Sequence, residues 1–246
     1  MRNKKVFLAI LAMALLLIPA LGRAEMYVGI YGGPNFIDNT TVTFTPTSGP
    51  GTILGPSTAH DVKMDPAVIG GLTVGYWFTR QGFLGYNYPD WMKYLGFAVD
   101  FSYHRMDVRV QQVRWTPPTI GTTLYDTGTD EGYAATLAFM FVGRYGFLPD
   151  SEVPFGRLQP YIAVGPAVFF SGQSSDDMGS ASSTDVALVV ESGIRYMALK
   201  NVSINLAFRY RYVRPTYTYN GIILGSVTQT QTFNLFNAIL GVSYHF

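Results

Sequence analysis

The stretch NVSINLAFRYRYV, residues 201–213, changes side-chain character at every second position. A β-strand directs successive side chains to opposite faces, so this alternation separates the two faces of one strand. The first face carries large apolar or aromatic side chains, at Val202, Ile204, Leu206, Phe208, Tyr210 and Tyr212. The second carries small, polar or basic side chains, at Ser203, Asn205, Ala207, Arg209 and Arg211. The stretch predicts a strand whose broad apolar face lies in apolar surroundings.

Seven further segments repeat this period of two, and little of the chain has a helical period near 3.6. They cover approximately residues 26–36, 67–78, 95–104, 133–145, 159–170, 186–196 and 236–246. With 201–213 they give eight strands of about 11–14 residues, enough for the ~9–11 residues with which a tilted strand crosses a bilayer. The even number places both ends of the chain on the same side.

The second face of these strands decides between two all-β architectures. A soluble β-sandwich would place Lys, Glu, Thr and Asp there, because that face would meet water. Here the face is rich in Gly, Ala and Ser with isolated charges, which is typical of the crowded lumen of a narrow barrel. Only 13% of the residues are charged, against roughly 25% in an average soluble domain. We therefore predict an all-β fold, an eight-stranded antiparallel up-and-down transmembrane β-barrel.

The first 24 residues, MRNKKVFLAILAMALLLIPALGRA, have the features of a secretory signal peptide. A basic start precedes an apolar core, and Gly22 and Ala24 suit a small-residue cleavage site. An uncleaved membrane anchor is the alternative, although Pro19 interrupts the short apolar run. We expect a signal peptide over 1–24 and a barrel domain over 25–246, in the outer membrane of a Gram-negative-type bacterium.

Composition excludes several kinds of function. Four of the 17 Lys and Arg residues fall in residues 1–24, which leaves 13 basic against 16 acidic residues and a formal charge of −3. A nucleic-acid partner is not expected, since a basic footprint is missing. The chain has no cysteine, which excludes disulfides, thiolate metal sites and a cysteine nucleophile.

The connections between the predicted strands differ on the two sides of the membrane. Long segments rich in Thr, Ser, Gly, Pro and Asp are expected to be exterior loops, over 37–65, 105–132, 171–184 and 214–232, and Asn220-Gly221 predicts a tight turn at the tip of the last hairpin. The short connections 147–157 and 199–201, and the longer 79–93, are expected on the periplasmic side. An aromatic girdle is predicted near that side, from Tyr76, Trp77, Phe78, Tyr86, Trp91, Tyr94, Tyr145, Phe147, Tyr196, Tyr244 and Phe246.

Four segments resemble the eight-stranded outer-membrane barrels of the OmpA-type transmembrane domain and small porin-like proteins. They are MYVGIYGGPNF (26–36), GGLTVGYWF (70–78), LQPYIAVGPAV (158–168) and ILGVSYHF (239–246). The ending, with Tyr244 and Phe246, resembles the signal read by the barrel-insertion machinery. The chain stops at the eighth strand, so the resemblance does not imply the peptidoglycan-binding domain of full OmpA.

The size of the chain also resembles small barrels of the OmpW type. In that family, a break in the wall is associated with lateral release of hydrophobic molecules, and Pro166 is the candidate position for such a break here. The alternative is a local β-bulge stabilised by Gly165.

Six charged residues fall on the inward face of the predicted strands and form a candidate lumen network, Asp100, Arg144, Glu191, Arg195, Arg209 and Arg211. A tight turn centred on Lys200 would place Glu191 opposite Arg209, as a buried ion pair. A charge is tolerated there only when it is paired and hydrogen-bonded, so the network is expected to plug the lumen. The alternative is a salt-bridge gate or a constriction for small anions.

Catalysis, cofactors and metals are not expected. In the resembling lipid A deacylases a His is followed two residues later by Ser, and His60, His104 and His245 lack that pattern. Acidic residues of the loops, Asp126, Asp130, Glu131, Asp176, Asp177 and Asp185, do not have the spacing of a calcium loop. They are expected to be solvated, with divalent ions that bridge lipopolysaccharide as the alternative.

We therefore predict a structural or surface-exposed barrel with a plugged lumen, expected to be a monomer. Its expected partners are outer-membrane lipids and lipopolysaccharide and, during biogenesis, the insertion machinery. A narrow channel for small or hydrophobic solutes is the alternative function, and a lipid-modifying enzyme is a third.

Overall fold

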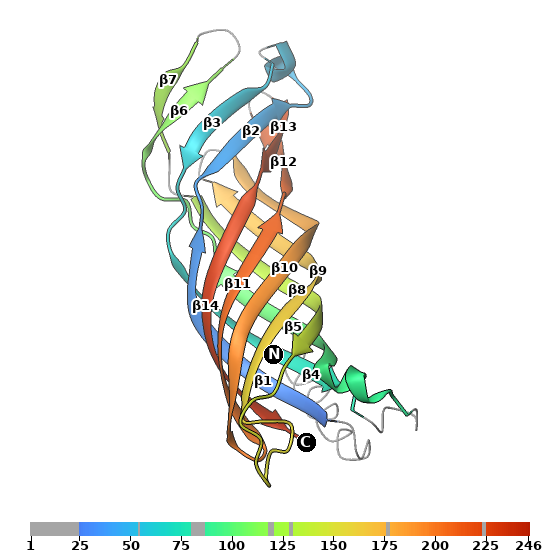
Figure 1. The fold of residues 1–246 in the computed structure, drawn as a ribbon. Coiled ribbons are helices and arrows are strands. Elements are labelled where there is room, and N and C mark those ends of the chain that lie inside the picture. Colours follow the sequence, from blue (N-terminus) through green and yellow to red (C-terminus); the bar gives the residue numbers. More distant parts are fainter. Residues whose placement is uncertain are drawn as a thin grey trace, which may run out of the picture.

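The computed structural model describes residues 25–53, 55–79, 87–117, 121–127, 130–175, 178–222 and 225–246 (Figure 1). The segment predicted as a signal peptide lies outside these residues. Eight antiparallel strands form a closed barrel in the order β1-β14-β11-β10-β9-β8-β5-β4. Their bounds are β1 Glu25–Ile37, β4 Ala67–Trp77, β5 Leu95–Arg105, β8 Asp130–Arg144, β9 Leu158–Ser175, β10 Gly179–Leu199, β11 Val202–Val213 and β14 Phe233–His245. The predicted fold class is confirmed.

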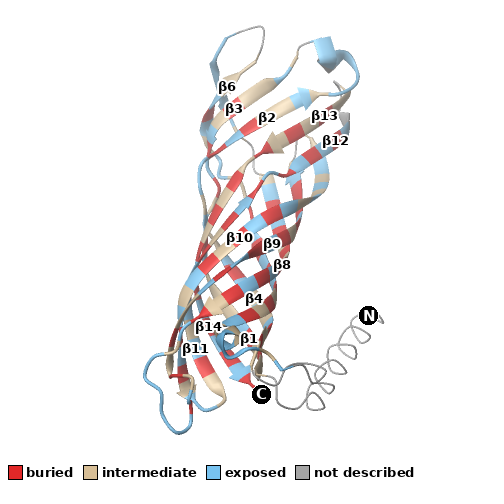
Figure 2. Ribbon diagram, turned by 45° about the vertical axis from the view of Figure 1, so that its right-hand side comes forward, coloured by how far each residue is buried: buried red, intermediate tan, exposed pale blue. Residues whose placement is uncertain are grey.

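Side chains along the barrel strands alternate between buried and exposed, which appears as bands of red and blue in Figure 2. The exposed members are large and apolar, as expected for a wall that faces lipid. Two short 3-10 helices, η2 (Pro50–Ile53) and η4 (Asp90–Tyr94), lie outside the strands. No helix in the described part of the chain is long and apolar enough to span a membrane.

A second sheet extends the molecule beyond one end of the barrel (Figure 1). It has six strands in the order β12-β13-β2-β3-β6-β7. Their bounds are β2 Thr40–Pro46, β3 Ser57–Val62, β6 Gln112–Thr116, β7 Thr123–Asp126, β12 Thr216–Ile222 and β13 Gly225–Gln231. A small apolar cluster of Val42, Ala59, Val62 and Val113 stabilises this sheet. We call it the extracellular sheet, because the longest connections of the barrel form it and such connections lie outside the cell in outer-membrane barrels.

The prediction of long exterior loops was wrong for much of these segments. Three of the four contribute strands to the extracellular sheet, and the fourth, 171–184, lengthens β9 and β10. Runs such as TTVTFTP and TYTYN, starting at Thr40 and Thr216, alternate β-branched or aromatic residues and so favour strands despite their polarity. The hairpin predicted in the last segment is present as β12 and β13, but its turn lies beyond Asn220-Gly221, because β12 continues through both residues to Ile222.

Aromatic side chains gather on the outer wall at both ends of the barrel. The periplasmic ring includes Tyr76, Tyr145, Phe147, Tyr196, Tyr244 and Phe246, whereas Tyr86 lies outside the described residues. A second ring, absent from the sequence prediction, lies at the extracellular end: Phe36, Tyr103, Tyr133, Phe170, Tyr210, Tyr212 and Phe236. The two rings bracket an apolar belt, as in barrels that span a membrane.

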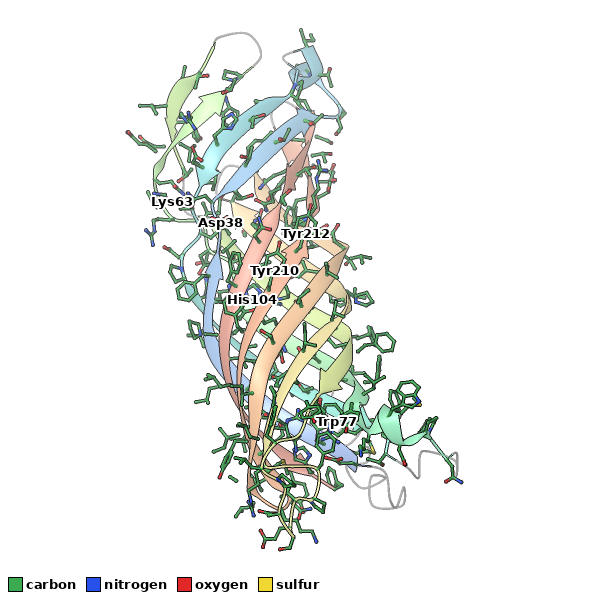
Figure 3. All side chains as sticks on the ribbon, viewed as in Figure 1. Asp38, Lys63, Trp77, His104, Tyr210 and Tyr212 are labelled. Atoms are coloured by element: carbon green, nitrogen blue, oxygen red, sulfur yellow. The ribbon has the colours of Figure 1, made fainter. Side chains whose placement is uncertain are left out.

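The placement of Trp77 in the girdle was wrong, because this side chain is 1% exposed and lies inside the barrel. It shares the inward face of β4 with Gly75 and Gly71, at the end of the barrel opposite the extracellular sheet (Figure 3). The alternation of β4 requires this orientation, since outward Tyr76 precedes Trp77.

Candidate functional site

All six residues of the predicted lumen network lie inside the barrel, and each is 7% exposed or less. They come from four strands, with Asp100 on β5, Arg144 on β8, Glu191 and Arg195 on β10, and Arg209 and Arg211 on β11. Each falls on the inward face of its strand because it alternates with an outward, lipid-facing residue. The structure arranges them in three layers along the lumen.

The middle layer is centred on Arg209, which joins two carboxylates. Its Nη1 and Nη2 donate to the two carboxylate oxygens of Asp100 at 2.8 and 3.1 Å, and its Nε donates to Oε2 of Glu191 at 2.6 Å. Glu191 pairs with Arg209 in the β10–β11 register, whereas Asp100 lies on β5, four positions away in the eight-stranded barrel. Arg209 therefore spans the lumen from one wall to the other.

Two tyrosines and Thr73 also donate hydrogen bonds to the carboxylates of this layer. The Tyr31 hydroxyl donates to Oδ1 of Asp100 at 2.7 Å, and the Tyr161 hydroxyl donates to Oε1 of Glu191 at 2.8 Å. Each buried carboxylate thus has a cationic and a neutral donor, which is the condition for tolerating buried charge.

The periplasmic layer is centred on Arg144. Its guanidinium donates to both carboxylate oxygens of Glu25, at 2.9 and 2.6 Å. It lies between the rings of Trp77 and Phe155, 3.8 and 4.1 Å from their centroids. The guanidinium of Arg195 stacks in the same way, 4.3 Å from the Tyr27 centroid. Cation–π contacts and a bidentate ion pair therefore fill this end of the lumen.

The third layer, nearer the extracellular end, contains Arg211. Its guanidinium donates to Thr136 Oγ1 at 2.7 Å, Asn237 Oδ1 at 3.1 Å and Ser102 Oγ at 3.4 Å. These described hydrogen-bond partners are all neutral. Thr136 and Ser102 belong to β8 and β5, so this side chain also crosses the lumen.

The space that remains between the middle and periplasmic layers is small. A cavity of about 40 Å³ lies beside Glu191, Arg195 and Arg209. At ~10–15 Å³ for each water, it has room for roughly three water molecules. The side chains therefore occupy most of the lumen at this level.

The sequence prediction missed several members of the network, namely Glu25, Tyr31, Trp77, Thr136 and Tyr161. Strand alternation places all of them on inward faces, so the signal was present in the sequence. Glu25 also changes the charge balance. The six predicted residues alone carry an excess of two positive charges, and Glu25, whose side chain is 28% exposed, lowers that excess to one.

Pro166 lies on the outer face of β9, next to a local gap in the hydrogen-bonded ladder. The β8–β9 pairing passes from Ala138↔Ala167 to Phe141↔Val164 without a change of register, so the predicted bulge at Gly165 was wrong. The pairing with β10 continues through Pro166. The gap arises because proline has no N–H to donate.

A matching gap occurs in the wall beside Pro34. The β1–β14 pairing passes from Gly32↔Leu240 to Asn35↔Asn237, again in constant register. In both places a glycine precedes the proline, and β1 and β9 are four positions apart in the barrel order. The two gaps therefore lie on opposite sides of the barrel.

The other predicted residues occupy distinct surroundings. Tyr244 and Phe246 lie on the outer wall at the periplasmic end, with ring centroids 5.0 Å apart. His104 is buried in the lumen, and its Nδ1 lies 3.1 Å from the Arg105 carbonyl oxygen. His60 lies on β3 of the extracellular sheet.

One arrangement has the residue types of a hydrolytic triad. His245 Nε2 lies 3.0 Å from Ser203 Oγ, and His245 Nδ1 lies 3.8 Å from Glu25 Oε1. Ser203 is fully buried, so a substrate carbonyl has no access to its hydroxyl. Among the described residues there is no group of three or more His, Asp or Glu side chains suited to a metal ion; Asp176 and Asp177 lie outside them.

Comparison with known proteins supports the barrel architecture. The sequence profile of the family described as outer membrane protein beta-barrel domain matches residues 8–246. No protein of curated function matches the sequence.

Solved structures of outer-membrane proteins have a similar fold. Neisserial surface protein A is 14% identical with a TM-score of 0.46, over 90% of this chain and 97% of its own. OprG from Pseudomonas aeruginosa is 15% identical with a TM-score of 0.47, over 92% and 98%. The outer membrane protease OmpT from Escherichia coli is 9% identical with a TM-score of 0.51, over 90% and 97%. At 9% identity, the similarity to OmpT shows the fold alone.

Proposed function

The chain belongs to the outer membrane protein β-barrel domain family, and we propose that it is a structural, surface-exposed barrel whose lumen is closed by its polar and charged network. The bridge from Arg209 to Asp100 and Glu191 carries this proposal. The interior of an eight-stranded barrel is just wide enough for side chains to fill, and here a guanidinium crosses it. The extracellular sheet supports the surface role, because it presents six strands beyond the membrane.

Single-channel recording tests the closed lumen. The refolded barrel is inserted into planar bilayers and compared with Glu191→Ala, which removes one of the two carboxylates held by Arg209. We expect wild-type barrels to be electrically silent. If the wild-type barrel conducts stably and Glu191→Ala changes that conductance, the proposal would be contradicted. The ion pair of Glu191 and Arg209 would then be identified as a gate.

A narrow conduit is the second candidate function, and Arg211 favours it. This buried cation has neutral partners among the described residues, which suits transient pairing with a small anion. The gap beside Pro166 is the feature that favours passage of hydrophobic solutes through the wall. If the barrel has an anion-selective conductance and Arg211→Gln abolishes it, the passage of anions through the lumen would be established.

Processing and assembly belong to the same proposal. Residues 1–24 act as a cleaved signal peptide, and residues 25–246 form a monomeric barrel whose terminal Tyr244 and Phe246 are read by the insertion machinery. The outward, adjacent placement of these two rings supports that role. The intact mass of the outer-membrane protein tests cleavage before Glu25, and a Phe246→Ser variant that assembles at the wild-type rate would contradict the role of Phe246.

We also propose that the barrel is not an enzyme. The burial of Ser203 supports this, because a serine hydrolase must present its nucleophile to a substrate. Covalent labelling of Ser203 by a fluorophosphonate probe in the folded protein would contradict it.

A further inference from the structure

The outer wall of β5, β8, β9 and β10 changes character sharply toward the extracellular end. The strand registers define rows of outward side chains that run around the barrel, such as Phe101, Leu137, Val168 and Val186. This row is entirely apolar. The next row, Tyr103, Ala135, Phe170 and Thr184, begins the extracellular aromatic ring.

The row above marks the boundary between lipid and water. It contains Arg105, Tyr133, Gly172 and Ser182, and it is followed by Glu131, Ser174 and Ser180. Aromatic rings at this height mark the interface of a transmembrane barrel, where lipid headgroups lie. The longest connections of this barrel, which form the extracellular sheet, lie at this end, so these headgroups belong to the outer leaflet.

A hollow of about 440 Å³ lies at this boundary, between the two rows. The Tyr133 ring lies over Gly172, where a Cβ would meet the tyrosine at 2.7–2.8 Å. The rings of Tyr103 and Tyr133 stack at 6.5 Å on the membrane side of the hollow. Arg105 and Glu131 lie at one flank, and the hydroxyls of Ser174, Ser180 and Ser182 lie at the other. The hollow thus combines an aromatic wall with hydrogen-bond donors and acceptors.

The charges beside the hollow argue against a ligand that is only a phosphate. Arg105 donates to Asp107 at 2.8 and 3.1 Å and lies 3.5 Å from Glu131. These three groups together carry one net negative charge, which opposes an anion. The hollow instead suits a sugar ring, which carries many hydroxyl groups. Those hydroxyls can bond to the carboxylates, the guanidinium and the serine hydroxyls, and the C–H groups of the sugar can pack against the tyrosine faces.

We propose that this hollow binds the sugar headgroup of an outer-leaflet glycolipid. The inference rests on the outer-membrane position that is part of the proposed function, and it is independent of whether the lumen is closed. Bound there, the sugar ring lies against Tyr133 while its acyl chains cover the apolar rows below.

Lipid retention measured by native mass spectrometry tests the proposal. The folded barrel is released from micelles that contain a diacyl glycolipid with one uncharged hexose, phosphatidylethanolamine or phosphatidylglycerol. The test variant is Gly172→Val, whose Cβ would lie 2.7–2.8 Å from Tyr133 side-chain atoms and would displace the ring that forms the wall of the hollow. Its control is Gly143→Val, an outward glycine of β8 whose Cβ meets only Ile162, at 3.9 Å. A second test variant, Arg105→Gln, changes no glycine and so does not strain the backbone. Its control is Arg114→Gln, on the extracellular sheet.

We expect wild type and both controls to retain the glycolipid, and both hollow variants to lose about tenfold in affinity for it. Equal retention of the glycolipid by wild type and the hollow variants would overturn the proposal. Wild-type retention of the phospholipids as strong as that of the glycolipid would also overturn it, because the hollow would then not recognise sugar. Conductance of the same preparation reports the lumen separately, so failure of either proposal is distinguishable.

Discussion

A single side chain, Arg209, holds two buried carboxylates in place across the lumen. Removing it leaves Asp100 and Glu191 without their cation, in surroundings where unpaired charge is costly. We expect Arg209→Met to lower the free energy of unfolding by about 3–5 kcal/mol, measured by urea unfolding in lipid vesicles. Arg114→Met, which breaks an exposed pair with Asp61, should cost less than about 1 kcal/mol.

The origin of that loss can be separated from lost packing. The triple variant Asp100→Asn, Glu191→Gln, Arg209→Met carries no charge in the middle layer. If uncompensated charge causes the destabilisation, the triple variant should be more stable than Arg209→Met alone. Equal stability of the two would attribute the loss to packing instead.

Asp150 makes the order of a periplasmic connection dependent on pH. Its Oδ1 accepts from the backbone N–H groups of Val153 and Glu152 at 2.7 and 2.9 Å, and Oδ2 contacts Arg157. The bond from Val153 and the contact with Arg157 hold the pKa of Asp150 below its ordinary value. The ionised Asp150 therefore orders the turn fully at pH values above the ordinary carboxyl pKa. This ordering is lost as the pH falls through the lowered pKa of Asp150 and the carboxylate becomes protonated.

We expect the chemical shift of the Val153 amide to change with pH, with a midpoint below the usual aspartate pKa of about 3.9. Asp150→Asn should abolish this titration and leave the barrel resonances unchanged. A midpoint at or above the ordinary value would contradict the assignment.

At the scale of the strand, Gly33-Pro34 and Gly165-Pro166 interrupt two ladders without shifting their registers. The prolines remove a donor, and the glycines allow the neighbouring backbone to come close. A Cβ on Gly165 would overlap the carbonyl oxygen of Phe139, and one on Gly33 would overlap that of Ala238. Backbone atoms cannot rotate away as a flexible side chain can, so the strands would have to separate.

Gly165→Ala should therefore destabilise the barrel by about 1–3 kcal/mol, in the range of overpacked sites. Gly143→Ala is the matched control, since its Cβ meets only Ile162 at 3.9 Å. The variants are compared by the temperature at which the folded band disappears in heat-modifiability gels. A loss no larger for Gly165→Ala than for Gly143→Ala would show that the strands at this gap adjust freely.

The barrel strands were predictable because lipid outside and a crowded lumen inside impose a strict alternation on each one. The same rule placed Glu191 opposite Arg209, since a tight turn fixes the register of its hairpin. Apart from its last hairpin, the extracellular sheet was not predicted, because it is rich in threonine and its polarity resembles that of a loop. Contacts across the lumen, such as Arg209 with Asp100, depend on barrel closure, which no local pattern specifies.

For the whole molecule, two structures are in a position to obstruct passage, the lumen layers and the extracellular sheet. We propose that the lumen layers are sufficient. The β6–β7 hairpin offers a test, because among the described residues its ladder pairing with the rest of the sheet is with β3 alone, over Thr58, Ala59 and His60. At its base, the Thr127 N–H donates to the Gln111 carbonyl oxygen at 2.8 Å.

A two-residue Asn-Gly turn that joins Gln111 to Thr127 therefore replaces residues 112–126 without separating the flanking chain. We expect the shortened protein to fold as a barrel and to remain silent in planar bilayers, because Arg144, Arg209 and Arg211 still cross the lumen. Conductance in the shortened protein would assign closure to the extracellular sheet. If the shortened protein is silent and the full-length Arg209→Ala variant conducts, closure is assigned to the lumen layers. The hydrogen bonds of these layers do not involve the deleted hairpin.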